Sequence, residues 1–116
     1  MRYLLSWHIR ESELRGRSPA WREEVVAFLA TFEDELLTNS ELDWVEVLDP
    51  ESRAVVVGPG AEVRQGFYNQ GGKPSARIWG IRVASRERAV EIAAILAGQL
   101  DTWIEVRECL PGAQRP

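Results

Sequence analysis

The stretch 77–100, RIWGIRVASRERAVEIAAILAGQL, contains the two apolar periodicities from which the fold is predicted. Residues 77–83 alternate, with Trp79 and Val83 on one face, which is the pattern of a β-strand. Ser85 is predicted to cap a helix, because its hydroxyl can accept a free N–H of the first turn. The apolar residues of that helix recur three or four positions apart, at Ala89, Ile92, Ala93, Leu96 and Leu100. The stretch is therefore predicted to be a strand followed by an amphipathic helix.

The same two patterns occur at the N-terminal end of the chain. Residues 3–9 alternate and are aromatic or branched enough to predict a strand. Ser18 and Pro19 are the residue types that commonly start a helix. The apolar stripe of this helix comprises Trp21, Val25, Phe28, Leu29, Phe32 and Leu36. Asn39 and Ser40 are predicted to end it.

The remaining segments complete a single α+β domain. Residues 43–48 and 53–57 alternate on either side of a short turn, which predicts a β-hairpin. Residues 103–109 are predicted to form the last strand. Two helices among five strands predict a ferredoxin-like antiparallel sheet with both helices on one face, over residues 1–110. Residues 111–116 are predicted to be a tail.

Composition excludes several classes of protein. The chain has 116 residues, 45% of them hydrophobic, and a formal net charge of −4, which suits one soluble domain. No apolar run is long enough to span a membrane, and the N-terminal stretch lacks the pattern of a secretory leader. The acidic balance argues against nucleic-acid binding. The single cysteine, Cys109, excludes an internal disulfide and favours a cytoplasmic location. With only one histidine as well, neither a metal site nor a cofactor is predicted.

Charge is distributed unevenly along the chain. Residues 1–22 carry a net charge of +3, residues 23–51 carry −10, and residues 52–116 carry +3. The middle segment contains ten acidic residues and no basic one. One interpretation is a solvated helix face followed by a turn. The other is an acidic surface that docks a basic protein partner.

The strands also carry the candidate site. His8 is the only histidine, and histidine is the side chain that changes charge near neutral pH. Alternation places His8 with Ser6, and the same alternation in neighbouring strands adds Arg82, Glu105 and Arg107. Such a set suits a small anionic ligand, with arginines binding a carboxylate or phosphate and His8 acting as general acid or base. The alternative is that this face is a subunit contact or a solvated surface.

A long loop is predicted over residues 58–76, which are rich in glycine and lack periodicity. Tyr68 in this loop is a further candidate ligand contact if the loop closes over a cleft, and otherwise the loop is mobile. Trp44 and Trp103 lie near strand beginnings and are predicted to form a subunit contact. The other three tryptophans are predicted to lie in the core.

Several segments resemble one known family. In order along the chain these are Met1–Leu5, Val55–Pro59, Ala61–Glu62, Ile78–Val83, Glu91–Ala93 and Ile104–Arg107. They are similar to the YCII-related proteins, and within them to the subgroup named for its Asp-Gly-Pro-Phe motif. The resemblance implies a ferredoxin-like domain that dimerises into an α/β barrel, with a cleft between sheets and helices or between subunits. It also implies an undefined function for most members and a His–Asp lyase or dehydrochlorinase chemistry for a few.

The family's motif is degenerate here. Val57 and Gly60 stand where the subgroup motif has Asp and Phe, and Trp21 follows Ala20 where the catalytic branch has a histidine.

Three hypotheses for the function follow from these observations. The first is a homodimeric YCII-like domain that binds a small anionic molecule. The second is a lyase or isomerase with His8 and Arg82 in one cleft, and the third is a protein-interaction module that uses the acidic first helix.

Overall fold

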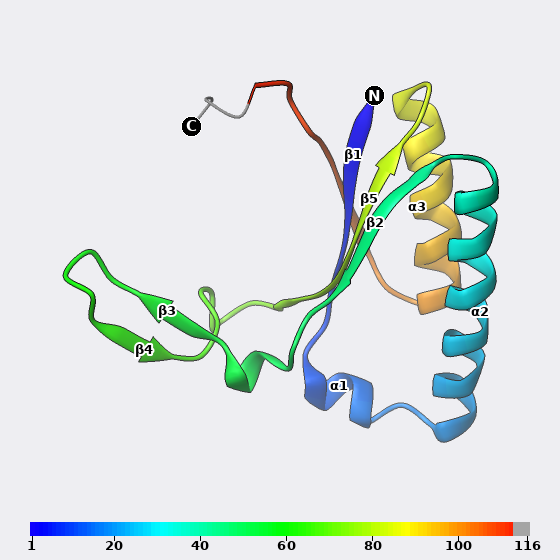
Figure 1. The fold of residues 1–116 in the computed structure, drawn as a ribbon. Coiled ribbons are helices and arrows are strands. Elements are labelled where there is room, and N and C mark those ends of the chain that lie inside the picture. The colour runs from blue at the N-terminus through cyan, green and yellow to red at the C-terminus, as the bar shows by residue number, and fades with distance from the viewer. Residues whose placement is uncertain (113–116) are drawn as a thin grey trace.

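The computed structural model describes residues 1–112, in which two long helices cover one side of a four-stranded antiparallel sheet (Figure 1). The elements in chain order are β1 (Arg2–His8), α1 (Glu11–Arg15), α2 (Pro19–Thr38), β2 (Leu42–Val47), the 3-10 turn η1 (Glu51–Arg53), β3 (Val55–Val57), β4 (Val63–Gln65), β5 (Ser75–Arg82), α3 (Arg86–Leu100) and β6 (Ile104–Glu108). The predicted α+β class is confirmed. Pro111 and Gly112 have no regular structure, and the rest of the predicted tail lies outside the described residues.

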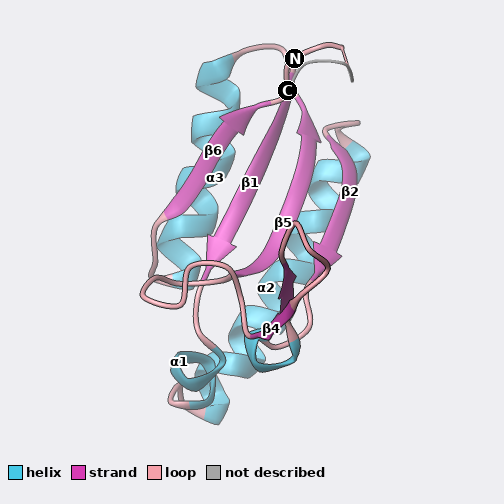
Figure 2. Ribbon diagram, turned by 90° about the vertical axis from the view of Figure 1, so that its left-hand side faces the viewer, coloured by secondary structure: helices cyan, strands magenta, loops and turns pink. Residues whose placement is uncertain are grey.

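The main sheet has the strand order β2-β5-β1-β6, and each neighbouring pair is antiparallel. This order is compatible with a ferredoxin-like fold. Figure 2 looks onto the side of the sheet that the helices leave uncovered, with α2 and α3 behind it. We call this side the open face. On the central strand β1 it carries Arg2, Leu4, Ser6 and His8, because successive side chains point to opposite sides.

The helices begin where the sequence predicts. The Ser18 hydroxyl accepts the Trp21 backbone N–H at 3.1 Å, and the Ser85 hydroxyl accepts the Arg88 N–H at 3.1 Å. Both stripes then pack onto the covered side of the sheet. Together with that side they form the core, which comprises Tyr3, Leu5, Trp7, Ile9, Val25, Leu29, Phe32, Leu36, Trp79, Ile81, Val83, Ala89, Ile92, Ala93, Leu96 and Leu100.

At the edge of this core, Glu33 of α2, whose side chain is partly exposed, joins the helix to β5. The Arg77 guanidinium donates to both Glu33 carboxylate oxygens, at 3.1 and 2.8 Å for Nη2. The indole Nε1 of Trp79 donates to Glu33 Oε2 at 2.8 Å. Trp79 is fully buried, so this carboxylate satisfies a donor that water cannot reach.

The predicted hairpin between residues 43–48 and 53–57 is wrong. Strand β2 pairs only with β5, while β3 pairs with β4 in a separate two-stranded sheet. The physical reason is burial: by pairing with β5, β2 packs Leu42 and Val45 against the core, whereas no residue of β3 belongs to it. A hairpin partner without a covering helix would leave both side chains in water. Residues 58–76, predicted as one long loop, hold β4 and the first two residues of β5 as well as loops.

The β3–β4 hairpin projects from the rest of the molecule (Figure 1). Val55, Val57 and Val63 are all more than half exposed on it. The radius of gyration is 15.8 Å, whereas a compact domain of this length has about 13 Å. The projecting hairpin accounts for an extended shape that the sequence patterns do not predict. Helix α1 is likewise not predicted.

Candidate ligand-binding site

Five of the six predicted site residues lie on the open face. The pairing places Ser6 opposite Ile78 and Glu105, and Leu4 opposite Gly80 and Arg107. Arg82 lies on the same side, opposite Arg2. The sixth, Tyr68, lies in the loop after β4 and is 86% exposed. The five sheet residues therefore share a surface, but they do not form one cluster.

The open face has two chemically different ends. Arg82 pairs with Arg2 at one end of β1, while His8 pairs with Ser75 at the other. Six positions along a strand span about 20 Å. The expectation that His8 and Arg82 line one cleft is therefore wrong for a single chain, because strand direction carries them to opposite ends of the sheet.

The first end is rich in arginine. Arg2 and Arg82 are direct cross-strand partners, and Arg107 lies on the neighbouring strand β6. Asp43 contacts Arg82, with Oδ2 at 3.3 Å from Nη2. Like charges directly opposite one another destabilise a sheet. Because one carboxylate faces three guanidinium groups, this end has a local excess of positive charge that a bound anion would relieve.

The second end contains His8, which lies close to Glu105. His8 Nε2 lies 3.6 Å from Glu105 Oε1, and both side chains are partly exposed. Beside His8 a groove of about 500 Å³ runs between the β2–β3 connection and the loop before β5. Its lining includes Tyr68, Phe67, Asn69, Lys73, Leu48 and Arg53. The structure thus brings His8 and Tyr68 to one groove, although the sequence places them far apart.

The loop beside this groove is held by the segment that follows β1. The Arg10 guanidinium donates to the backbone carbonyls of Gln70, at 2.7 Å, and Gly72. Lys73 Nζ lies 2.9 Å from Glu13 Oε2. This hydrogen bond from Lys73 lowers the pKa of the Glu13 carboxyl. These contacts use side chains that would otherwise be free to receive a ligand.

Trp44 lies at the open face, and it has a partner that alternation alone does not reveal. Trp44 lies opposite Gly80, and a Cβ at position 80 would collide with the indole ring. Trp44 is 43% exposed and Trp103, just before β6, is 93% exposed. A tryptophan directly opposite a glycine in a paired strand would have identified this contact. That position can be recognised only once the register of β2 against β5 is known.

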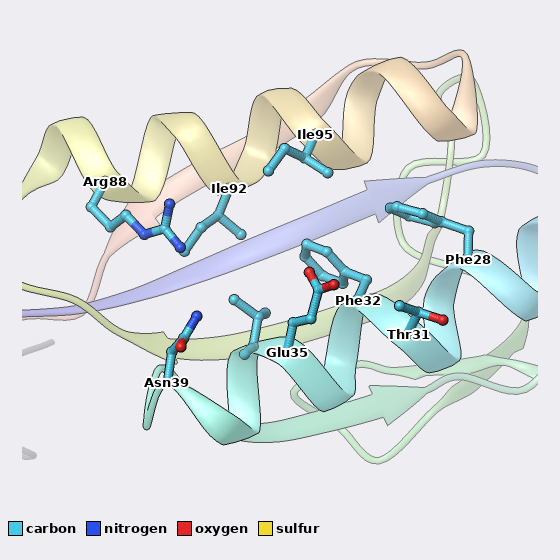
Figure 3. A pocket seen from close by; sticks show the side chains of 9 residues that line it. Phe28, Thr31, Phe32, Glu35, Asn39, Arg88, Ile92 and Ile95 are labelled. Atoms are coloured by element: carbon cyan, nitrogen blue, oxygen red, sulfur yellow. The ribbon is translucent and has the colours of Figure 1, made fainter.

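A separate groove of about 190 Å³ lies between α2 and α3, with Phe28, Phe32, Ile92 and Ile95 along it (Figure 3). Arg88 lies at one end, where it donates to Glu41 at 2.8 and 2.9 Å. The hydrogen bond from Arg88 lowers the pKa of Glu41, and the same bond raises the pKa of Arg88. Because its cation is already neutralised and the other charged side chain in its lining is the Glu35 carboxylate, this groove offers no free positive charge to an anion.

Comparison with known proteins does not assign this chain to a family. No family model matches the sequence, and no curated protein matches it. None of the described helices is long and apolar enough to cross a membrane. Over residues 1–112, no group of three or more His, Cys, Asp or Glu side chains is placed to hold a metal ion.

Proposed function

We propose that the chain is a small-anion-binding domain that works as a homodimer of the YCII-like, dimeric α/β barrel type. The observation that carries this proposal is the apolar strip across the open face. Trp44, Leu4 and Ile78 lie there without a covering helix, and Trp103, which is exposed, immediately precedes the edge strand β6. A sheet that faces water normally carries polar side chains on that side. A second copy of the same face is a partner of matching area and composition.

Charge on the open face supports pairing with a second copy. One end carries Arg2, Arg82 and Arg107, whereas the other carries Glu105 and Glu46. A two-fold axis near the middle of the face would set the arginine end of each copy against the acidic end of the other. Self-complementary patches of this kind are what a two-fold interface requires. The same arrangement would bring His8 of one copy toward Arg82 of the other.

The proposed anion binds at the arginine end. Arg107 has no ion pair among the described residues, and Arg82 shares its charge with a single carboxylate, that of Asp43. A carboxylate or phosphate there would take guanidinium hydrogen bonds and reduce the repulsion between Arg2 and Arg82.

The assembly is tested by light scattering after gel filtration. The wild type is expected to be a dimer at micromolar concentration, and Trp44→Glu with Trp103→Glu is expected to be a monomer. Val90→Glu is the matched control, because Val90 is about half exposed on α3, away from the open face. A wild type that stays monomeric throughout the micromolar range refutes the dimer.

The ligand is tested by thermal shift with inorganic phosphate and with small organic carboxylates. Arg107→Ala and Arg82→Ala should abolish a stabilisation that Arg64→Ala, on the exposed β3–β4 hairpin, leaves intact. Equal shifts in all three variants would mean that the anion binds elsewhere or acts as a general salt effect.

A lyase or isomerase is the second candidate, and the contact between His8 and Glu105 favours it. A carboxylate that holds an imidazole is a common arrangement for a general base. Activity toward a carboxylate substrate should then be lost in His8→Asn and reduced in Glu105→Gln. Docking through the acidic segment 23–51 has less support, because Glu33 and Glu41 already pair with arginines of the same chain.

A further inference from the structure

The outer edge of β6 is a free border of the main sheet. Strand β6 pairs with β1 on one side and, within residues 1–112, has no strand on the other (Figure 2). The Cys109 N–H donates to the Arg2 carbonyl at 2.8 Å. Because alternate residues of an antiparallel strand direct their backbone groups to the same side, those of Arg107 and Glu105 also face β1. The other residues of β6 have outward-pointing backbone N–H and C=O groups: Ile104, Val106 and Glu108.

The opposite border of the sheet shows how a free edge is normally protected from other chains. On β2 the register shifts after Leu42, which interrupts the regular row of hydrogen-bonding groups. Both charged residues of β2, Asp43 and Glu46, are acidic, so two copies of this edge would repel each other. Strand β6 has neither protection. Its pairing with β1 is regular, and the two charges on its open-face side, Glu105 and Arg107, have opposite signs.

The charge pattern of β6 is self-complementary. When two copies of β6 are set antiparallel with Val106 opposite Val106, Glu105 of each copy lies directly opposite Arg107 of the other. The outward backbone groups of the two Val106 residues then form a hydrogen-bonded pair. The Glu105–Arg107 pairs fall at the narrow positions, where opposite side chains lie closest. Moving the centre by one residue toward either end would set Glu105 against Glu105 or Arg107 against Arg107, so charge selects this one register.

Both charged side chains lack a close partner within one chain. Arg107 is exposed and makes no ion pair within residues 1–112. The Glu105 side chain is 52% exposed, and its Oε1 lies 3.6 Å from His8 Nε2, which is too long for a hydrogen bond. A second copy of the edge would supply each of them with an opposite charge at a cross-strand position.

We propose that the outer edge of β6 binds the same edge of a second copy, antiparallel and centred on Val106. The two main sheets then continue as one sheet across a two-fold axis. Main-chain hydrogen bonds of Ile104, Val106 and Glu108 join the strands, and the two Glu105–Arg107 pairs fix the register. This edge is a different surface from the open face, so the contact does not depend on the open-face dimer. The two proposals share Arg107, which also belongs to the proposed anion site.

Exchanging the charges tests the register, with Trp44→Glu as the parent protein so that the open-face contact is disrupted. In analytical ultracentrifugation, Glu105→Arg and Arg107→Glu should each weaken self-association about tenfold, because two attractive cross-strand pairs become repulsive. An equimolar mixture of the two variants should associate as tightly as the parent, since opposite charges again meet across the edge. Arg64→Glu, on the exposed strand β4, is the matched control and should leave association unchanged. The proposal is overturned if the parent stays monomeric into the millimolar range, or if mixing the two variants restores nothing.

Amide hydrogen exchange measured by NMR identifies the edge itself. In a single chain the N–H groups of Ile104, Val106 and Glu108 face outward, whereas those of Glu105 and Arg107 face β1. As the concentration of the Trp44→Glu protein rises, exchange at the three outward groups should slow. Exchange at the two groups that face β1 should stay the same. Outward groups whose exchange does not depend on concentration would overturn the proposal, whether or not the open-face dimer forms.

Discussion

Replacing Glu33 by alanine should destabilise the fold more than any other single change to a charged side chain of α2. The substitution removes the acceptor of the buried Trp79 N–H, which costs about 1–3 kcal/mol. It also removes the hydrogen bonds of Arg77, whose side chain is 19% exposed, and charged hydrogen bonds contribute about 1.5–3 kcal/mol. Water can partly replace the second loss but not the first. The expected decrease in the free energy of unfolding is therefore about 3 kcal/mol.

Urea denaturation followed by tryptophan fluorescence measures this change, and the melting temperature should fall by about 10 °C. Asp34→Ala is the matched control, since Asp34 is the exposed neighbour of Glu33 and should change stability by less than about 0.5 kcal/mol. Trp79→Phe in the Glu33→Ala background should cost less than in the wild type, because the unsatisfied donor is gone. A loss below about 1 kcal/mol for Glu33→Ala would refute the reasoning.

Three smaller predictions follow from other contacts. Gly80→Ala should cost about 1–3 kcal/mol in urea denaturation because its Cβ collides with the Trp44 ring, and Trp44→Ala should suppress most of that loss. The Arg88–Glu41 pair lowers the pKa of Glu41, so its contribution is present at neutral pH and lost as pH falls through that lowered pKa. Arg88→Gln should accordingly cost about 1 kcal/mol at neutral pH and less in acid, and an equal loss at both would contradict this. Ser18→Ala should cost about 1 kcal/mol by calorimetry, whereas Ser18→Asp should be nearly neutral.

Local signals in the sequence predict the helices well and the strand partners poorly. The hydroxyls of Ser18 and Ser85 each accept a backbone N–H three residues later in the chain. The start of each helix can therefore be recognised from the local sequence. Strand pairing depends on which surface buries more apolar area. Residues 42–47 and 55–57 are close in sequence and both rich in valine, yet only the first reaches the core. The sequence pattern therefore predicts a hairpin that burial does not favour.

In the candidate site, too, local features can be predicted from the sequence and non-local ones cannot. Alternation correctly groups Ser6, Glu105 and Arg107 on one side of the sheet, because the side to which a residue points depends only on its position along its own strand. Separation along the sheet is not local, and the pairing of Arg82 with Arg2 could not be deduced without the register.

The central position of β1 has a consequence for how the chain is made. Leu5 pairs with Trp79 on one side and with Val106 on the other, so the strand synthesised early is completed by two that are synthesised late. At ordinary rates of translation the 116 residues take between about 6 and 23 seconds. Through most of that interval the apolar face of β1 has no sheet to join, which makes the nascent chain a natural client for chaperones. If the ribosome stalled before β6 was synthesised, the edge of β1 that pairs with β6 would stay exposed to other chains.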